Sequence, residues 1–450
     1  MKAFGESLGL HTQVDEAGNV LIRKPASEGM ADRQTVVLQS HLDMVHQKNA
    51  ATQFDFDTQG IDMYVDGDWV KARGTTLGAD NGIGVAAIMA LLSATDIPHP
   101  PLEALFTIDE ETGLTGALAL KGGVLQGHIL LNLDTEEDTE LTIGCAGGID
   151  ITGKGVYEQV NPAGDTAYYI RVKGLTGGHS GADIHLGRGN ANKLMNRVLY
   201  GLAKKVDVEI AAIDGGSLRN AIPRESVALI VVAAQQVPVL NAVIEELDAA
   251  FKEEYRATDP QLTLTLEAAQ LPALVMKAEF RDLLLPAVYA CPNGIYRMSP
   301  EIAGLVQSSN NLARVLVQDG DYSLQCLTRS SVDTEKEDLA SAIASAFGLM
   351  GAELLRNNSY PGWQPRPDAP IVQLMSTLYK KLFGTDAHVD AVHAGLECGI
   401  LGTHYPDMQM ISFGPNIYGA HSPDERVQIS SVQKFWNFLL ETLKRIPKAS

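Results

Sequence analysis

Four short apolar runs, each bounded by polar or turn-forming residues, constrain the fold of this chain more than any other feature. The runs span residues 36–38, 102–108, 129–133 and 408–413. None shows the strict alternation of a strand with one wet face, so each predicts a buried strand covered on both sides. Helical stretches at 81–94 and 113–120 lie between them. This succession predicts an α/β domain with a mixed sheet flanked by helices.

The pattern changes after about residue 150, and 450 residues are enough for two domains. Strand-like segments at 168–173, 227–232 and 262–266 accompany amphipathic helices at 191–205 and 239–253. Residues 361–365, with the sequence PGWQP, are typical of a linker, and a last helix is expected at 432–445. We therefore expect one domain from 1–150 plus 361–450, with an inserted α+β domain at 151–360. The insert is long enough for two small α+β units.

The composition limits the possible partners. Lys plus Arg total 35 against 55 Asp plus Glu, a formal net charge of −20. Such a surface repels polyanions, so we expect no nucleic acid and no anionic membrane as partner.

Other features bear on the compartment. The start, MKAFGESLGLHTQ, has no apolar segment of the secretory type, and the longest apolar stretch, 85–92, is too short to span a bilayer. The four cysteines form no CxxC pair and are interpreted as buried thiols. These features predict a soluble, cytoplasmic protein.

Polar residues stand where the predicted strands end. His41 and Asp43 follow the first strand, Glu110 and Glu111 the second, and Asp134 the third. His421 lies in a loop after the fourth strand, and Asp80 precedes the helix at 81–94. In open α/β sheets, ligands bind at the carboxyl ends of the strands. These side chains are therefore expected at one edge of the sheet.

Each residue alone allows a simpler interpretation. Asp80 could be a helix N-cap, the Glu110–Glu111 pair a solvated turn, and a single histidine a structural residue. Taken together, two histidines and three carboxylates are the ligand set that suits zinc, manganese or cobalt. Sites of this kind with one shared carboxylate hold two metals about 3.5–4 Å apart in hydrolases.

Six segments carry a resemblance to a known family. They are LQSHLDMV, GTTLGADNGIGVAAIMALL, TIDEETGLTGA, NLDTEEDTELTIGCAGG, GLTGGHSGADIH and GAHSPDE. Together they resemble the co-catalytic zinc metallopeptidase group that includes aminoacylase and carnosinase, and most closely its bacterial Xaa-His dipeptidases. The similarity runs from about residue 10 to the C-terminus. Similar enzymes have a further helix and loop ahead of that point, so we expect this chain to lack that segment.

The resemblance implies the ligand roles. His41 and Asp134 would bind one Zn²⁺, Glu111 and His421 the other, and Asp80 would bridge both. Co²⁺ or Mn²⁺ are the alternatives to zinc. The first domain would then be the metal-binding catalytic domain and the insert its lid.

Two neighbours of the ligands have roles in catalysis on this hypothesis. Glu110, which is not needed as a ligand, would take a proton from a metal-activated water and pass it to the leaving amine. Asp43, two residues after His41, would accept the other ring N–H of His41 and fix its tautomer. The alternative for Asp43 is a surface turn residue.

Further residues are assigned by resemblance. His179 would stabilise the oxyanion of the tetrahedral intermediate, and Asn220 and Arg329 would hold the free carboxylate of the substrate. The alternatives are a loop-structuring histidine and a strand-edge ion pair of Arg329. His393 and Glu397 are a further candidate pair, in which the glutamate would bind the substrate's α-amino group.

The resemblance implies a dipeptidase for small peptide substrates, including Xaa-His, with a homodimer as one possible assembly. An aminoacylase or tripeptidase on the same scaffold is the alternative enzyme. A non-catalytic binding protein on a decayed peptidase scaffold is the alternative from another class. The intact Glu110 and all five ligands argue against it.

Overall fold

The computed structural model describes residues 1–449, which separate into two compact units. The first unit comprises Met1–Cys145, Trp363–Val392 and Leu396–Ser450, and the second comprises Ala146–Gly362 with His393–Gly395. The short segment His393–Gly395 thus groups with the second unit, although the chain on both sides of it belongs to the first.

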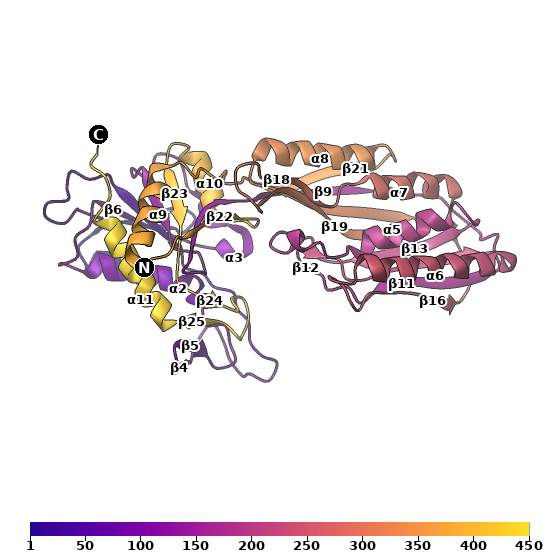
Figure 1. Ribbon diagram of the computed structural model, residues 1–450, viewed down its shortest axis with the longest axis horizontal. Coiled ribbons are helices and arrows are strands. Elements are labelled where there is room, and N and C mark those ends of the chain that lie inside the picture. The colour runs from indigo at the N-terminus through magenta and orange to yellow at the C-terminus, as the bar shows by residue number, and fades with distance from the viewer. Residues whose placement is uncertain (450) are drawn as a thin grey trace. The chain divides into compact units, whose positions relative to one another are not determined.

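The first unit is built on a mixed eight-stranded sheet (Figure 1). In sheet order its strands are β1 (His11–Val14), β2 (Val20–Lys24), β6 (Leu102–Thr107), β3 (Val36–His41), β7 (Ile129–Asn132), β23 (Gln409–Ser412), β8 (Glu140–Cys145) and β22 (His388–Val392). The four apolar runs of the sequence form the neighbouring strands β6, β3, β7 and β23, which are mutually parallel. The predicted α/β fold with a mixed sheet is confirmed.

Helices cover both faces of this sheet. They are α1 (Lys2–Ser7), α2 (Ala79–Ser93), α3 (Glu110–Gly113), α4 (Thr115–Ala119), α9 (Pro370–Phe383), α10 (Glu397–His404) and α11 (Ile429–Leu443). Val37 of β3 belongs to the hydrophobic cluster that includes α4 and α10, whereas Ser40, on the opposite face of β3, lies against Gly84 of α2. Every residue of β3 is buried, including the polar residues 39–41 that follow its apolar run.

Two local features of the first unit differ from the expectation. The helix expected at 113–120 is two short helices, because Leu114 has a left-handed φ of 55° that ends α3 and precedes α4. A small antiparallel sheet was not foreseen. Its strands are β24 (Ile417–Tyr418), β25 (Arg426–Gln428), β5 (Trp69–Ala72) and β4 (Met63–Asp66).

The second unit has one long antiparallel sheet with the order β16-β11-β15-β13-β19-β20-β9-β21, and β18 pairs with β19 (Figure 1). The strands are β9 (Gly147–Val156), β11 (Thr166–Lys173), β13 (Glu209–Gly216), β15 (Ser226–Val232), β16 (Thr263–Ala269), β18 (Gly294–Met298), β19 (Val306–Gln318), β20 (Asp321–Ser330) and β21 (Glu353–Tyr360). The helices are α5 (Ala191–Leu202), α6 (Val237–Glu254), α7 (Ala278–Ala290) and α8 (Asp333–Gly348). Residues at every second position of the strands pack in one hydrophobic cluster with residues of all four helices. The helices therefore cover one face of the long sheet. Two short pairs complete the unit, β10 (Gln159–Val160) with β17 (Val275–Met276) and β12 (Gly178–His179) with β14 (Ala221–Ile222).

The long sheet consists of two halves with the same topology. In one half, β11, α5, β13, β15, α6 and β16 follow one another, and the strand order is fourth, first, third, second. In the other half, β9, α7, β19, β20, α8 and β21 give the same order. Each half is a split β-α-β unit. Strands β13 and β19 join the halves edge to edge, with Ile213 opposite Val317.

None of the helices among residues 1–449 is long and apolar enough to cross a membrane. All four cysteines are buried, as expected.

Candidate metal centre and active site

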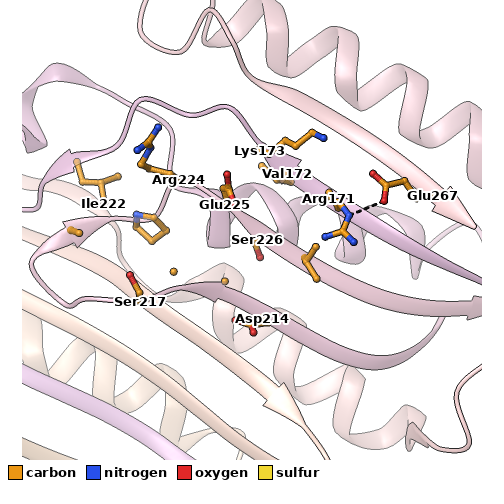
Figure 2. Close-up of a pocket in the computed structure, with 15 residues that line it drawn as sticks. Arg171, Val172, Lys173, Asp214, Ser217, Ile222, Arg224, Glu225, Ser226 and Glu267 are labelled. Atoms are coloured by element: carbon orange, nitrogen blue, oxygen red, sulfur yellow. Dashed lines mark hydrogen bonds and ion pairs between the residues drawn. The ribbon is translucent and has the colours of Figure 1, made fainter. Parts of the chain in front are cut away.

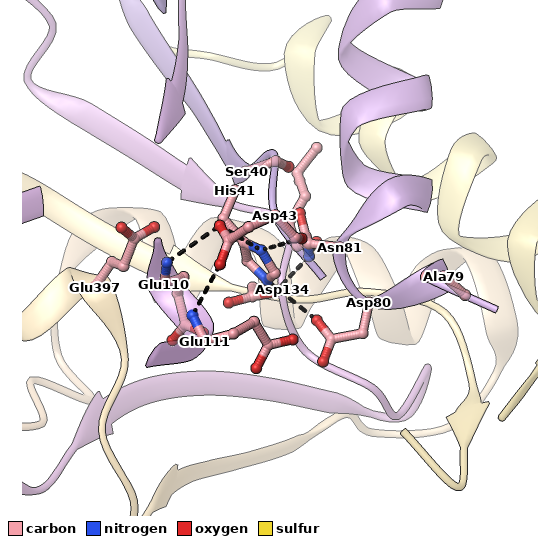
Figure 3. Close-up of polar contacts among 12 residues, drawn as sticks. Ser40, His41, Asp43, Ala79, Asp80, Asn81, Glu110, Glu111, Asp134 and Glu397 are labelled. Carbon is pink, nitrogen blue, oxygen red and sulfur yellow. Dashed lines mark hydrogen bonds and ion pairs between the residues drawn. The ribbon is translucent and has the colours of Figure 1, made fainter. Parts of the chain in front are cut away.

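The parallel strands of the first unit bring the predicted ligands to one edge of the sheet (Figure 3). His41 is the last residue of β3, and its side chain is 1% exposed. Asp134 follows β7, the neighbour of β3, while Glu110 and Glu111 follow β6 on the other side. The strand-end pattern in the sequence therefore corresponds to one place in the fold.

His41, Asp80 and Asp134 form the first group of donors. Nε2 of His41 is 3.2 Å from Oδ1 of Asp80 and 3.4 Å from Oδ1 of Asp134. Burial raises the pKa of Asp134, and the charge of His41 lowers it, with a net rise to about 6. Burial lowers the pKa of His41, but the charge and hydrogen bond of Asp134 outweigh this and raise it.

Asp80, Glu111 and His421 form the second group. Nε2 of His421 is 3.3 Å from Oδ2 of Asp80 and 3.0 Å from Oε2 of Glu111. Asp80 thus offers one oxygen to each group, which is the geometry of a bridging carboxylate. Its backbone is not helical (φ −85°, ψ 104°), and its side chain turns to the two histidines instead of capping α2.

This donor set fits divalent cations. In each group the three donor atoms lie within 4.8 Å of one another, and residues 1–449 contain no such group outside this cluster. The side chain of Glu111 is 6% exposed, which excludes a solvated turn, and its Oε1 is buried without a hydrogen-bond partner in the described chain. A buried acceptor of this kind is costly unless something binds it, and a cation would do so. Two imidazoles and three carboxylates suit zinc, cobalt or manganese.

Asp43 organises both the histidine and the glutamate turn. Its two carboxylate oxygens accept hydrogen bonds from the main-chain N–H of Glu110 and of Glu111, each at 3.1 Å. Nδ1 of His41 is 3.0 Å from the main-chain oxygen of Asp43 and 3.5 Å from its Oδ1, so the backbone carbonyl is the nearer acceptor. Burial raises the pKa of Asp43, but these hydrogen bonds lower it to about 2.

Glu110 lies beside the predicted ligands and is partly buried. Its carboxylate groups with donor atoms of His41 and Glu111. Burial is the main cause that raises its pKa to about 9, and the charge of Asp134 adds to it. A carboxyl group that readily holds a proton is suited to proton transfer.

Glu397 lies in the same unit, at the start of α10 and fully buried. Its Oε2 accepts hydrogen bonds from Nε2 of Gln39 and Oγ1 of Thr107, each at 2.6 Å, whereas Oε1 has no partner among the described residues. Burial raises its pKa to about 7, although the bond from Thr107 lowers it. The free oxygen makes Glu397 a candidate acceptor for a cationic ligand group.

The second unit brings His179 and Asn220 together. His179 pairs with Ala221 between β12 and β14, and the main-chain oxygen of Asn220 accepts a bond from Ser180 N at 2.8 Å. Nδ1 of His179 accepts main-chain N–H groups at 3.2 and 3.0 Å, so its proton lies on Nε2. Burial and then the charge of Arg329 lower the pKa of His179. A neutral imidazole that donates from Nε2 can stabilise an oxyanion.

Arg329 on β20 is 5% exposed and has no carboxylate partner among residues 1–449. Its Nη1 donates to the phenolic oxygen of Tyr360 at 2.9 Å, and its Nε is buried without a hydrogen-bond partner there. The alternative of a strand-edge ion pair therefore finds no support. A buried guanidinium without a counterion is expensive unless it serves to bind an anion.

The candidate pair His393 and Glu397 have different hydrogen-bond partners. Nε2 of His393 lies 2.7 Å from Oγ of Ser309 in the second unit, whereas Glu397 contacts Gln39 and Thr107 in the first. Burial, followed by the charge of Arg329, lowers the pKa of His393 to about 3. His393 is thus a buried neutral group beside Arg329.

A separate hollow of about 820 Å³ lies in the second unit (Figure 2). Cationic and anionic side chains are balanced around it, namely Arg171, Lys173, Arg224, Asp214, Glu225 and Glu267. None of the predicted site residues lines it, and Arg171 already pairs with Glu267 at 2.9 Å. Its charges therefore give no sign of a particular ligand.

Three residues that contact the site were not foreseen. Asn81 donates from Nδ2 to Asp134, Tyr360 contacts Arg329, and Glu425 binds the turn before Asp80. Asn81 and Glu425 stand inside the recognised segments GADNG and GAHSPDE, which was the only signal for them. Nothing in the local sequence marks Tyr360.

The comparisons with known proteins agree with this geometry. The model of peptidase family M20/M25/M40 matches residues 37–445. The chain belongs to this family. It is therefore a peptidase of the M20 type, a class of hydrolases that use divalent metal ions, and its paired donor groups agree with that use.

Individual M20 relatives are similar over almost the whole chain. The cytosol non-specific dipeptidase of Escherichia coli is 45% identical over 445 residues, covering 99% of this chain and 92% of the relative. The crystal structure of aminoacylhistidine dipeptidase from Vibrio alginolyticus superposes with a TM-score of 0.94 at 41% identity, covering 100% of this chain and 92% of that one. A tripeptidase from Staphylococcus aureus has a TM-score of 0.55 at 16% identity, covering 99% and 91%, and shares the fold alone.

Proposed function

We propose that this M20 peptidase is a cytoplasmic dipeptidase that hydrolyses unblocked dipeptides, Xaa-His among them, with two Zn²⁺ ions. The observation that carries the proposal is the buried, uncompensated guanidinium of Arg329, which suits the free carboxylate of a short peptide. The two relatives of more than 40% identity are named as dipeptidases, one of the cytosol and one for aminoacylhistidine.

His41 and Asp134 would hold one cation, Glu111 and His421 the other, and Asp80 both. The opposed oxygens of Asp80 support this division. When bound, such a pair supplies a nucleophile of lowered pKa derived from water and polarises the scissile carbonyl. Co²⁺ or Mn²⁺ would satisfy the same donors.

The remaining roles belong to the protein's own groups. Glu110 would accept a proton at its carboxylate and return it to the leaving amine, as its burial among charged donors favours. Asp43 would keep the Glu110–Glu111 turn and the ring of His41 in place. His179 would donate from Nε2 to the oxyanion.

The two charged ends of a dipeptide would have different partners. Arg329 and Asn220 would bind the C-terminal carboxylate, while the free Oε1 of Glu397 would accept the α-ammonium group. Burial and then the charge of the nearby Arg329 lower the pKa of His393. His393 would therefore take part in substrate binding indirectly, as a neutral neighbour of Arg329. In this scheme the first unit is the catalytic domain and the second its lid. A homodimer stays a prediction.

A substrate panel tests the proposal. Purified protein loaded with Zn²⁺ should hydrolyse free dipeptides, including Xaa-His, with two ions per chain by elemental analysis. N-acetylated amino acids and tripeptides should be poor substrates. A preference for N-acetylated amino acids would indicate an aminoacylase, and a preference for tripeptides would indicate a tripeptidase. No hydrolysis of any member by metal-loaded protein would favour the decayed, non-catalytic alternative.

A further inference from the structure

The carboxylate of Glu425 binds the turn that leads into Asp80. Its Oε2 accepts hydrogen bonds from Leu77 N at 2.7 Å and Gly78 N at 2.9 Å, and its Oε1 accepts from Ala79 N at 2.8 Å and Asp80 N at 3.3 Å. Glu425 is only 2% exposed. Four consecutive main-chain donors thus converge on one buried side chain.

The local sequence explains why an outside acceptor is needed. The turn precedes the regular part of α2, because Asp80 and Asn81 have non-helical backbone angles, and Gly78 has no side chain to accept the free N–H groups. Gly78 has a φ of 73°, and a Cβ there would lie 2.7 Å from Sδ of Met44, so a residue with a capping side chain would be strained at this position. A carboxylate from another segment satisfies these main-chain donors, which would otherwise be left unpaired.

Glu425, which accepts these hydrogen bonds, belongs to the loop that carries His421. This loop lies between β24 and β25, which pair with each other, and β25 pairs further with β5. Within the loop, Glu425 N donates to the oxygen of Ser422 at 3.1 Å. Glu425 therefore fastens the Asp80 turn to the loop whose His421 ring lies 3.3 Å from Asp80.

We propose that Glu425 is a positioning residue for the second donor group, Asp80, Glu111 and His421. It fixes the Asp80 turn against the His421 loop before any cation binds, so that the donors need no rearrangement. This inference rests on the proposed function, because it assumes that this group holds one of two cations. The proposed role of Glu425 is to lower the free energy that is needed to form the metal site. Glu425 itself would contact neither cation nor substrate.

The test compares Glu425→Gln with Glu103→Gln. An amide keeps one acceptor and points its NH₂ at main-chain N–H groups, so the Asp80 turn loses part of its support. We expect Zn²⁺ to bind about 10- to 100-fold more weakly at the group with His421, measured by competition with a chromophoric chelator, and the group with His41, which shares Asp80, to weaken less. Glu103 is the matched control, since it is also 2% exposed and accepts main-chain N–H bonds from Gln126 and Gly127. Glu103→Gln should bind both ions as the wild type does.

Wild-type affinity for both ions in Glu425→Gln would overturn the proposal. Equal losses in the two variants would also overturn it, because they would show a general effect of stability. Failure of the proposed function has a different signature, namely wild-type protein that binds fewer than two ions or cleaves no dipeptide. If Glu425→Gln does not fold, amide exchange of residues 77–80 in metal-free wild type decides. Slow exchange supports a turn held in advance, and exchange at the rate of open loops overturns it.

Discussion

Oδ1 of Asp43 accepts a hydrogen bond from the main-chain N–H of Glu110 at 3.1 Å. The bond fixes the backbone of the glutamate turn without using the side chain of Glu110. The Glu110 carboxylate would therefore be available for proton transfer. Orientation and proton transfer are thus divided between two acidic residues. A substitution at Glu110 should therefore change chemistry without moving the ligands.

Glu110→Gln should retain both metal ions and lose kcat by about a thousandfold or more, because an amide cannot accept the proton. The measurement is steady-state kinetics on a free dipeptide together with elemental analysis of the same sample. Full metal occupancy with near-normal turnover would refute the role given to Glu110. Loss of metal would instead make Glu110 a ligand.

Asp80→Ala should lower the metal content to one ion or fewer per chain, because both donor groups share this carboxylate. Asp68→Ala is the control, since Asp68 lies in the same unit and binds Gln428 and Ser430 at the surface. Elemental analysis after dialysis should find two ions in the control. Two tightly held ions in Asp80→Ala would contradict the bridging assignment.

The catalytic sheet was predictable because burial on both faces leaves a direct trace in sequence. Strands β3, β6, β7 and β23 each contain a short group of large apolar residues, and parallel pairing brings the ends of these strands to one edge. His41 and Asp134 could therefore be placed together without any structure. In the structure, Nε2 of His41 lies 3.4 Å from Oδ1 of Asp134.

Other features leave no such trace. Strand β4 has Met63 and Val65 exposed at 62% and 66%, and its sheet is completed by β24 and β25, more than three hundred residues later. A pairing of that range has no local periodicity to reveal it. The four hydrogen bonds of Glu425 could not be predicted from the sequence either, because they depend on how two loops that are distant in the sequence meet. The residues around either loop do not reveal this contact.

His393→Gln should reduce the loss of folding stability that occurs when the pH is lowered. Burial, then the charge of Arg329, lowers the pKa of His393 to about 3, whereas histidine in an unfolded chain takes up this proton near its ordinary pKa of 6.5. Between these values the unfolded state binds more protons, so the stabilisation is complete above pH 6.5 and is lost as pH falls towards 3. The loss from one such group approaches about 1.4 kcal/mol per pH unit.

Urea unfolding of metal-free protein at pH 7, 6 and 5 measures this slope. The wild type should lose stability on acidification more steeply than His393→Gln. The exposed His388 provides the control, and His388→Gln should keep the wild-type slope. Identical slopes in the wild type and His393→Gln would show that His393 does not remain neutral in the folded state.

Arg329→Ala should depress kcat/KM for free dipeptides by about two to four orders of magnitude, because it removes the cation that faces the substrate carboxylate. C-terminally amidated dipeptides should be poor substrates of the wild type and lose little more in the variant. Arg314→Ala is the control, since Arg314 lies in the same unit and already pairs with Asp214. Its kcat/KM should stay near that of the wild type. Equal losses on free and amidated substrates would mean that Arg329 acts through the structure of the second unit, and the carboxylate would need another partner.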